Sequence, residues 1–111
     1  MRYVMVTNWH GYWDKLPGGL AMYTDKMFVP PMSMGRLANG TPTTFLLFSK
    51  HPREPLKAWS GTVSDIDVLP RKVSFRVRLR REIRFPRRYT GLADGWYLVE
   101  KGTAQPQAGL W

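Results

Sequence analysis

The sequence predicts a mainly β (α+β) domain: a small barrel of five to six short strands with one or two short helical turns. Short runs rich in β-branched and aromatic residues recur about every 10–15 residues, as in small barrels and sandwiches. Glycines and prolines mark the segments between these runs. The 111 residues are enough for a single core, and little of the chain has the pattern of a helix.

Six segments are expected to be strands, with an antiparallel meander at the centre of the domain. The first segment is apolar on both faces and should therefore be a central strand. The run TTFLLFS should be a buried strand. Residues 33–40 predict one short helical turn, which Ser33 could cap. The predicted strands cover residues 2–7, 20–27, 43–49, 56–67, 71–85 and 96–100.

The basic segment Arg71–Arg88 holds nine of the 17 Lys and Arg residues and one acid. Apolar and polar residues alternate up to Leu79, which predicts a strand with one buried and one wet face. The phase then breaks at the adjacent Arg80 and Arg81, so a bulge or bend is expected there. In the facing strand, Gly61 indicates a bulge or a close backbone approach. The wet face is either a solvated charged surface or a binding surface for a polyanion.

The net charge of +9 favours an anionic partner, either nucleic acid or lipid. No apolar run is long enough for a membrane span, and no basic amphipathic helix is visible, so no membrane partner is expected. Cysteine is absent, which excludes disulfides and thiolate chemistry and fits a cytoplasmic protein. The N-terminus lacks a signal-peptide core.

Six residues form a predicted base pocket. Flat aromatic rings can stack on an unpaired base, each stack being worth about 1–3 kcal/mol, and an amide can bond a base edge. The alternative is that the rings belong to the core and that the asparagine is a turn residue. The six residues are Asn8, Trp9, Tyr12, Trp13, Tyr23 and Trp59.

Basic residues on the basic strand, at its ends and in predicted turns form a predicted phosphate-binding set. Phosphate contacts would give affinity, and the aromatic pocket would give selectivity. This set consists of Arg36, Lys50, Arg53, Arg71, Lys72, Arg76, Arg78, Arg80, Arg84, Arg87 and Arg88.

The sequence gives little support for catalysis, and neither a cofactor nor a metal is expected. His10 and His51 are too few for a metal site, and no cysteine could complete one. Asp65 and Asp67 are expected to be exposed rather than part of a nuclease site. No phosphate-cradling glycine motif is present.

The order of short motifs resembles an EVE domain, a member of the PUA-like superfamily related to YTH domains. The motifs are YVMVTNW at 3–9, LANG at 37–40 followed by FLLF at 45–48, WSGTV at 59–63 and the basic strand from Val73 to Leu79. This resemblance, shared with the N-terminal DNA-reading modules of McrB-type restriction systems, implies a PUA-like barrel that holds one plain or methylated base. A single domain over residues 1–101 is expected, and the polar and small residues 102–111 are expected to form a flexible tail.

The expected function is therefore a nucleic-acid-binding module that captures a base, with phosphate contacts from the arginine strand. Two alternatives stay open: an RNA-binding barrel without base selectivity, and a protein-interaction module for an acidic partner. The expected partner is DNA or RNA, and the domain either acts alone or is one module of a larger protein.

Overall fold

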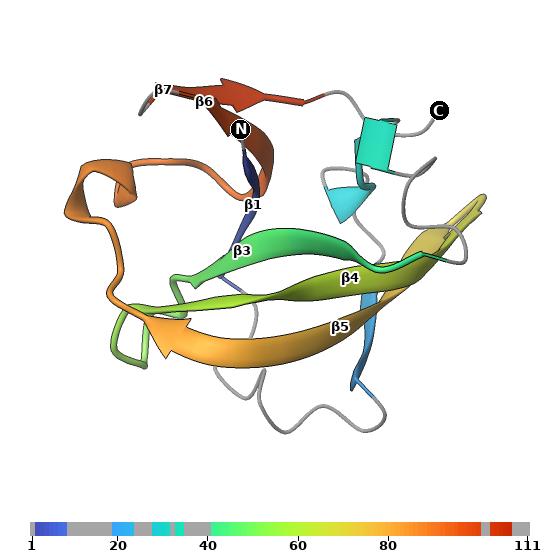
Figure 1. Cartoon of the computed structure of the whole chain (residues 1–111), viewed down its shortest axis with the longest axis horizontal. Helices are drawn as coiled ribbons and strands as arrows, with labels where there is room; N and C mark the ends of the chain where they lie inside the picture. Colours follow the sequence, from blue (N-terminus) through green and yellow to red (C-terminus); the bar gives the residue numbers. More distant parts are fainter. Residues whose placement is uncertain are drawn as a thin grey trace.

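The fold is a single mixed sheet, seen in a computed structural model that describes residues 2–8, 19–23, 28–31, 33–34, 41–100 and 103–107 (Figure 1). Within these residues, the sheet has seven strands in the order β2-β5-β4-β3-β1-β6-β7. They are β1 (Arg2–Thr7), β2 (Leu20–Tyr23), β3 (Thr43–Ser49), β4 (Lys57–Leu69), β5 (Lys72–Ile83), β6 (Gly95–Glu100) and β7 (Thr103–Pro106).

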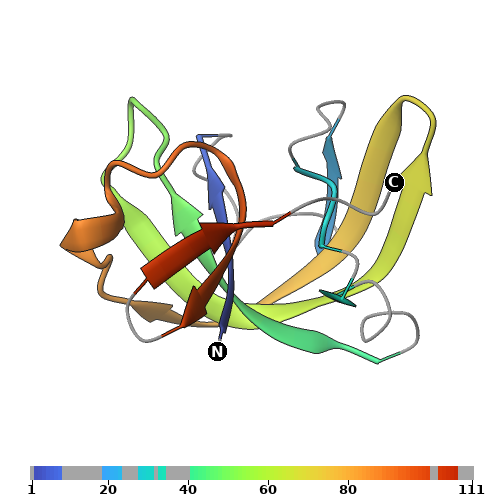
Figure 2. The ribbon, with the colours of Figure 1, turned by 90° about the horizontal axis from the view of Figure 1, so that it is seen from above.

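The mainly β prediction is confirmed, but the prediction of a closed barrel of five to six strands is wrong. The sheet stays open because its edge strands, β2 and β7, do not pair with each other. Strands β3, β4 and β5 form the expected antiparallel meander. Figure 2 shows the sheet curving, with the β4–β5 hairpin projecting away from β6 and β7.

The alternation of apolar and polar residues predicted the positions of most strands well. β1 and β3 have the predicted bounds, and β1 is central because it lies between β3, to which it is parallel, and β6. Residues 103–106, which lie within the expected tail, form β7 on β6. The short 3-10 helix η4 (Arg87–Tyr89) was not expected. Most of the predicted turn at 33–40 lies outside the described residues.

Two hydrophobic cores lie on opposite faces of the sheet, because successive side chains of a strand point to opposite sides. The first core includes Met5 and Leu47, and the second includes their neighbours Val4 and Phe48. Tyr89, from η4, covers the second core. Beyond the second core, the described residues on the same face of the sheet are mostly polar and are exposed or half-buried.

The predicted irregularity in the basic strand is present and involves Gly61. The β4–β5 ladder joins Gly61 to Leu79 and then Ser60 to Arg81, so Arg80 is an extra residue in β5. A Cβ on Gly61 would lie 2.5 Å from the Arg78 carbonyl oxygen, so only glycine lets the two backbones come this close. Both expectations, a bulge in β5 and a close approach at Gly61, are confirmed.

Beyond the second core, the same face of the sheet carries the four arginines of β5, and we call this part the arginine face. Arg76 and Arg78 lie on it, opposite Ser64 and Thr62 of β4. Cross-strand partners share a face, so Leu20 and Met22 of β2 lie on it too; both are exposed. The arginine face is therefore a cationic surface with small hydroxyl side chains on one side and apolar ones on the other. No helix among the described residues has the length and apolar character that a membrane crossing requires.

Candidate functional site

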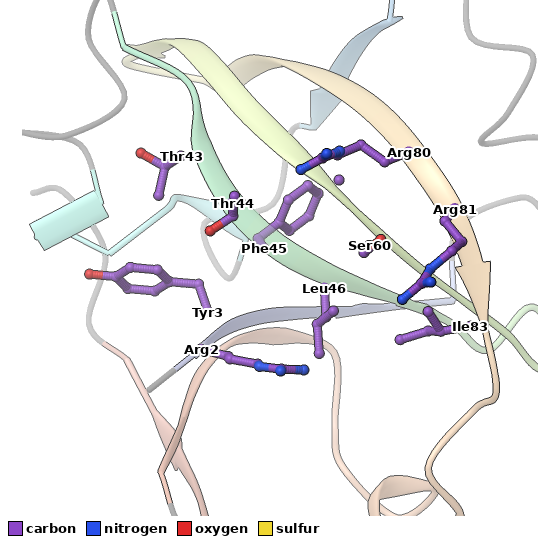
Figure 3. A pocket seen from close by; sticks show the side chains of 11 residues that line it. Arg2, Tyr3, Thr43, Thr44, Phe45, Leu46, Ser60, Arg80, Arg81 and Ile83 are labelled. Atoms are coloured by element: carbon purple, nitrogen blue, oxygen red, sulfur yellow. The ribbon is translucent and has the colours of Figure 1, made fainter.

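A groove of about 510 Å³ opens where the arginine face meets the second core (Figure 3). It lies over β1, β3, β4 and the end of β5. Its lining consists of three arginines, four residues with hydroxyl groups, three apolar residues and one glycine: Arg2, Tyr3, Thr43, Thr44, Phe45, Leu46, Ser60, Gly61, Arg80, Arg81 and Ile83. We call this the arginine groove.

The bulge in β5 supplies two of the three arginines. With Arg80 as the extra residue, Arg80 and Arg81 both face the same side of the sheet as Ser60. Figure 3 shows both side chains extending from β5 across β4. Arg2 comes from β1 and lies on the far side of Leu46. The three guanidinium groups therefore border one hollow from two sides, and all three residues are exposed.

The floor of the groove is apolar and its walls offer hydroxyl groups. Leu46 and Ile83 form this floor; both are half-buried and pack against the second core. Ser60 pairs with both Leu46 and Arg81, so it lies between the floor and the arginine wall. Thr44, on the neighbouring strand, is exposed. A ligand in the groove would meet cations at its rim and hydrocarbon at its base.

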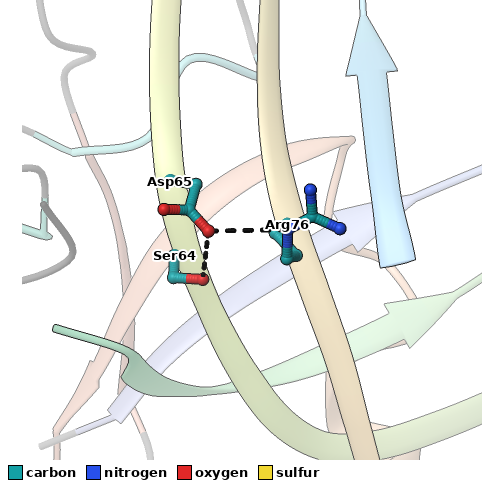
Figure 4. A network of polar contacts seen from close by, with 3 residues as sticks. All are labelled: Ser64, Asp65 and Arg76. Carbon is teal, nitrogen blue, oxygen red and sulfur yellow. Dashed lines mark hydrogen bonds and ion pairs between the residues drawn. The ribbon is translucent and has the colours of Figure 1, made fainter. Parts of the chain in front are cut away.

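None of the described residues that line the groove carries a carboxylate, so none of them neutralises its positive charge. The one ion pair between described residues lies further along β5, where Arg76 Nε is 3.5 Å from Asp65 Oδ2 (Figure 4). Asp65 has a φ of 53° at an irregularity of the ladder, and Ser64 Oγ donates a 3.2 Å hydrogen bond to its carboxylate. The positive potential is therefore expected to be strongest at the groove end of the arginine face.

The predicted phosphate-binding residues fall into separate places. Arg76, Arg78 and Arg80 share the arginine face, whereas Arg71 and Lys72 lie at the tip of the β4–β5 hairpin. Lys50 Nζ donates a 2.6 Å hydrogen bond to the Leu92 carbonyl oxygen. The other described residues of the set are exposed: Arg53 in the β3–β4 connection, and Arg84, Arg87 and Arg88 after β5. The guanidinium group of Arg88 lies over the Tyr89 ring. Arg36 lies outside the described residues.

Two of the predicted pocket rings are in the first core. Tyr23 is 7% exposed and stacks on Phe28 and Phe75, with ring centroids 4.1 and 5.7 Å away. Trp59 is 6% exposed and belongs to the same core. Neither ring presents a face to a base, because protein covers both. This corrects their assignment to an open pocket and favours the alternative that they are core residues.

The other three predicted pocket rings, Trp9, Tyr12 and Trp13, lie outside the described residues. Asn8 is exposed at the end of β1, where its backbone N–H donates a 3.1 Å hydrogen bond to Asp94 Oδ2. Burial raises the pKa of Tyr23; a hydrogen bond with Thr7 lowers it, and the negative charge of Asp94 adds to the rise. Burial and Asp94 also raise the pKa of Tyr97.

The predicted phosphate-binding set lacked two of the three groove arginines, Arg2 and Arg81. Simple alternation placed Arg81 inward, although the phase break beside it already indicated a bulge. Arg2 is an isolated basic residue at the start of an apolar strand, and no local pattern links it to β5. It reaches the groove only through the order β5-β4-β3-β1, which sequence periodicity does not give.

The described residues contain no group of three or more His, Asp or Glu side chains that could hold a metal ion. A scan against protein-family models finds no match, and searches of curated proteins and of solved structures find no similar chain.

Proposed function

We propose that this protein binds nucleic acid, with the arginine groove as the principal phosphate-binding site. The observation that carries the proposal is the meeting of Arg2, Arg80 and Arg81 around one hollow, with no carboxylate among the described residues that line it. Guanidinium groups bind phosphate in a bidentate fashion, and exposed arginines gathered without counter-charges are what phosphate recognition requires. The net charge of +9 would attract a polyanion over longer distances.

The arginine face extends the proposed site beyond the groove. Arg78 and Arg76 continue the row along β5 in steps of two residues, or about 6.6 Å. A row with such regular spacing suits the repeating charges of a nucleic-acid backbone. The sequence resemblance to EVE domains supports the same class of partner. The proposal covers DNA and RNA alike, because phosphate contacts carry no information on the sugar or the base.

An acidic protein is the second candidate, because a cationic surface also attracts clustered carboxylates. The exposed Leu20 and Met22 beside Arg76 favour it, since protein interfaces combine apolar and charged contacts. Inorganic polyphosphate and polyglutamate of equal length separate the two candidates. A phosphate site prefers the first polymer, whereas a site adapted to carboxylates prefers the second.

Fluorescence anisotropy with a labelled 12-nucleotide strand at several salt concentrations tests the proposal. For single strands, the slope of log K against log salt is about −0.7 per neutralised phosphate. Arg2→Gln, Arg80→Gln and Arg81→Gln are each expected to weaken binding and to reduce the slope by about 0.7. Arg71→Gln, about 30 Å from Arg81 along β5, is the matched control and should change affinity less than twofold.

Two results would overturn the proposal. One is the absence of salt-dependent binding to any nucleic acid. The other is an equal loss of affinity in Arg71→Gln and Arg81→Gln, which would indicate diffuse attraction by net charge instead of a site at the groove.

A further inference from the structure

We infer that the arginine groove holds one unpaired nucleotide of a single-stranded nucleic acid, with its base against the floor formed by Leu46 and Ile83. This inference rests on the proposed function and adds a base-binding site to it. The site lies on the opposite face of the sheet from Tyr23 and Trp59, which belong to the first core.

The apolar floor is the first reason for placing a base in the groove. Phosphate needs only hydrogen-bond donors and cations, and it gains nothing from a hydrocarbon surface. Leu46 and Ile83 nevertheless form the bottom of the groove directly below the arginines. A base is the apolar, flat part of a nucleotide, and removing its faces from water against aliphatic side chains is favourable. The guanidinium planes above can stack on the exposed ring face.

The size of the hollow is the second reason. Its volume of about 510 Å³ lies in the range of sites for small organic ligands, about 300–1,000 Å³. One nucleotide fits this volume, with its base on the floor and its flanking phosphates at the rim beside Arg2 on one side and Arg80 and Arg81 on the other. A phosphate group alone would leave most of the hollow to water.

The shape of the site indicates an unpaired base. Proteins read the bases of a duplex with elements that project into a groove of the nucleic acid. Here the surface recedes into the protein, so a base reaches the floor only when it is outside the stack. The flanking strand then continues along the arginine row toward Arg78.

The wall residues predict weak selectivity among bases. The hydroxyl groups of Thr44 and Ser60 can each donate or accept a hydrogen bond, so they adapt to different base edges. Among the described lining residues there is no Asn, Gln, Asp or Glu that would impose one fixed pattern. We therefore expect affinities for the four homopolymer strands to differ by less than about tenfold, unlike sites with a bidentate base contact.

Methyl NMR of Leu46 and Ile83 tests the inference directly. The full-length protein is titrated with a 12-nucleotide single strand, with inorganic polyphosphate of the same charge and with a duplex of the same sequence. A base on the floor shifts both residues' methyl signals through its ring current. Polyphosphate should bind without these shifts, and the duplex should bind more weakly than the single strand.

A variant that fills the space above the floor of the groove should lower the affinity for a base but not the affinity for phosphate. Ser60→Leu places a larger side chain between Leu46 and Arg81 and is expected to weaken single-strand binding at least fivefold, while affinity for polyphosphate changes less than twofold. Ser74→Leu is the matched control: it lies on the same face, opposite Met22 of β2, and should alter neither affinity.

The outcomes distinguish failure of this inference from failure of the proposed function. If single strands and polyphosphate bind equally well, with no shifts at Leu46 and Ile83, the base site does not exist but phosphate binding stands. Equal or tighter binding of the duplex, without those shifts, also overturns the inference alone. If no phosphate polymer binds in a salt-dependent manner, both proposals fail together.

Discussion

Arg80 and Arg81 are consecutive in the chain, yet both side chains lie on the same face of the sheet. In a regular strand the two side chains would point to opposite faces of the sheet. The extra residue in β5 instead brings both cations to one groove. Irregularities of this kind commonly redirect side chains at functional sites.

Gly61→Ala tests how closely β4 approaches β5 at the bulge. The new Cβ would lie 2.5 Å from the Arg78 carbonyl oxygen, so the strands must separate. We expect the free energy of unfolding to fall by about 1–3 kcal/mol, the usual cost of overpacking. Urea denaturation followed by circular dichroism measures it. Gly91→Ala is the control, because a Cβ there has no atom within 4 Å, and an equal loss in both variants would contradict the prediction.

Trp59→Ala distinguishes a core residue from a pocket residue. Trp59 is buried in the first core, so its truncation should lower the free energy of unfolding by about 3–5 kcal/mol, as for other large aromatic residues. Thermal and urea denaturation measure the loss. A variant with unchanged stability but weaker nucleic-acid binding would instead restore Trp59 to a base pocket.

Asp65→Asn is expected to tighten nucleic-acid binding by about two- to fivefold at low salt, because it removes the carboxylate beside Arg76. Asparagine tolerates the positive φ of residue 65, so the backbone should be retained. Stability should change by less than about 0.5 kcal/mol, since the ion pair is exposed. Anisotropy titrations measure the affinity. Glu100→Gln removes the same charge from the end of β6 and should have a smaller effect; equal effects would mean that only net charge matters.

Tyr23→Phe should make the protein less sensitive to alkali. Burial raises the pKa of Tyr23 in the folded state above the value of about 10 in the unfolded chain. Below pH 10 the phenol is protonated in both states. Above it, the unfolded state loses the proton first, so stability falls as pH rises. Urea midpoints at about pH 8 and pH 11 should differ more for the wild type than for Tyr23→Phe. Identical differences would contradict the prediction.

Sequence periodicity predicted the strands well because each has a local cause. The alternation from Val73 to Leu79 defined β5, and its break at Arg80 and Arg81 located the bulge. The sequence pattern did not predict every strand of the sheet. β7 was missed because its four residues, TAQP, lack the apolar pattern of a strand. The open form of the sheet depends on β2 and β7 remaining unpaired with each other, and no local motif specifies this.

The site was predicted in part, for physical reasons that differ between residues. Arg76, Arg78 and Arg80 share a face because strand geometry requires it. Arg2 joins the groove through long-range pairing of β1 with β3, which residue types alone do not specify. An aromatic residue such as Trp59 suits a core and a stacking surface equally well, so composition could not assign it to either.

Strand β1 has a further consequence for how the protein is made. Val4 lies between Leu46 of β3 and Tyr97 of β6, so one neighbour comes from the middle of the chain and the other from near its end. During synthesis, the ribosome releases the β3–β4–β5 meander, whose contacts are local, well before β6. Strand β1 must therefore wait, with one edge unpaired, until residues 95–100 have emerged. During that interval, a chaperone that binds exposed apolar strands would have its largest effect on aggregation of the nascent chain.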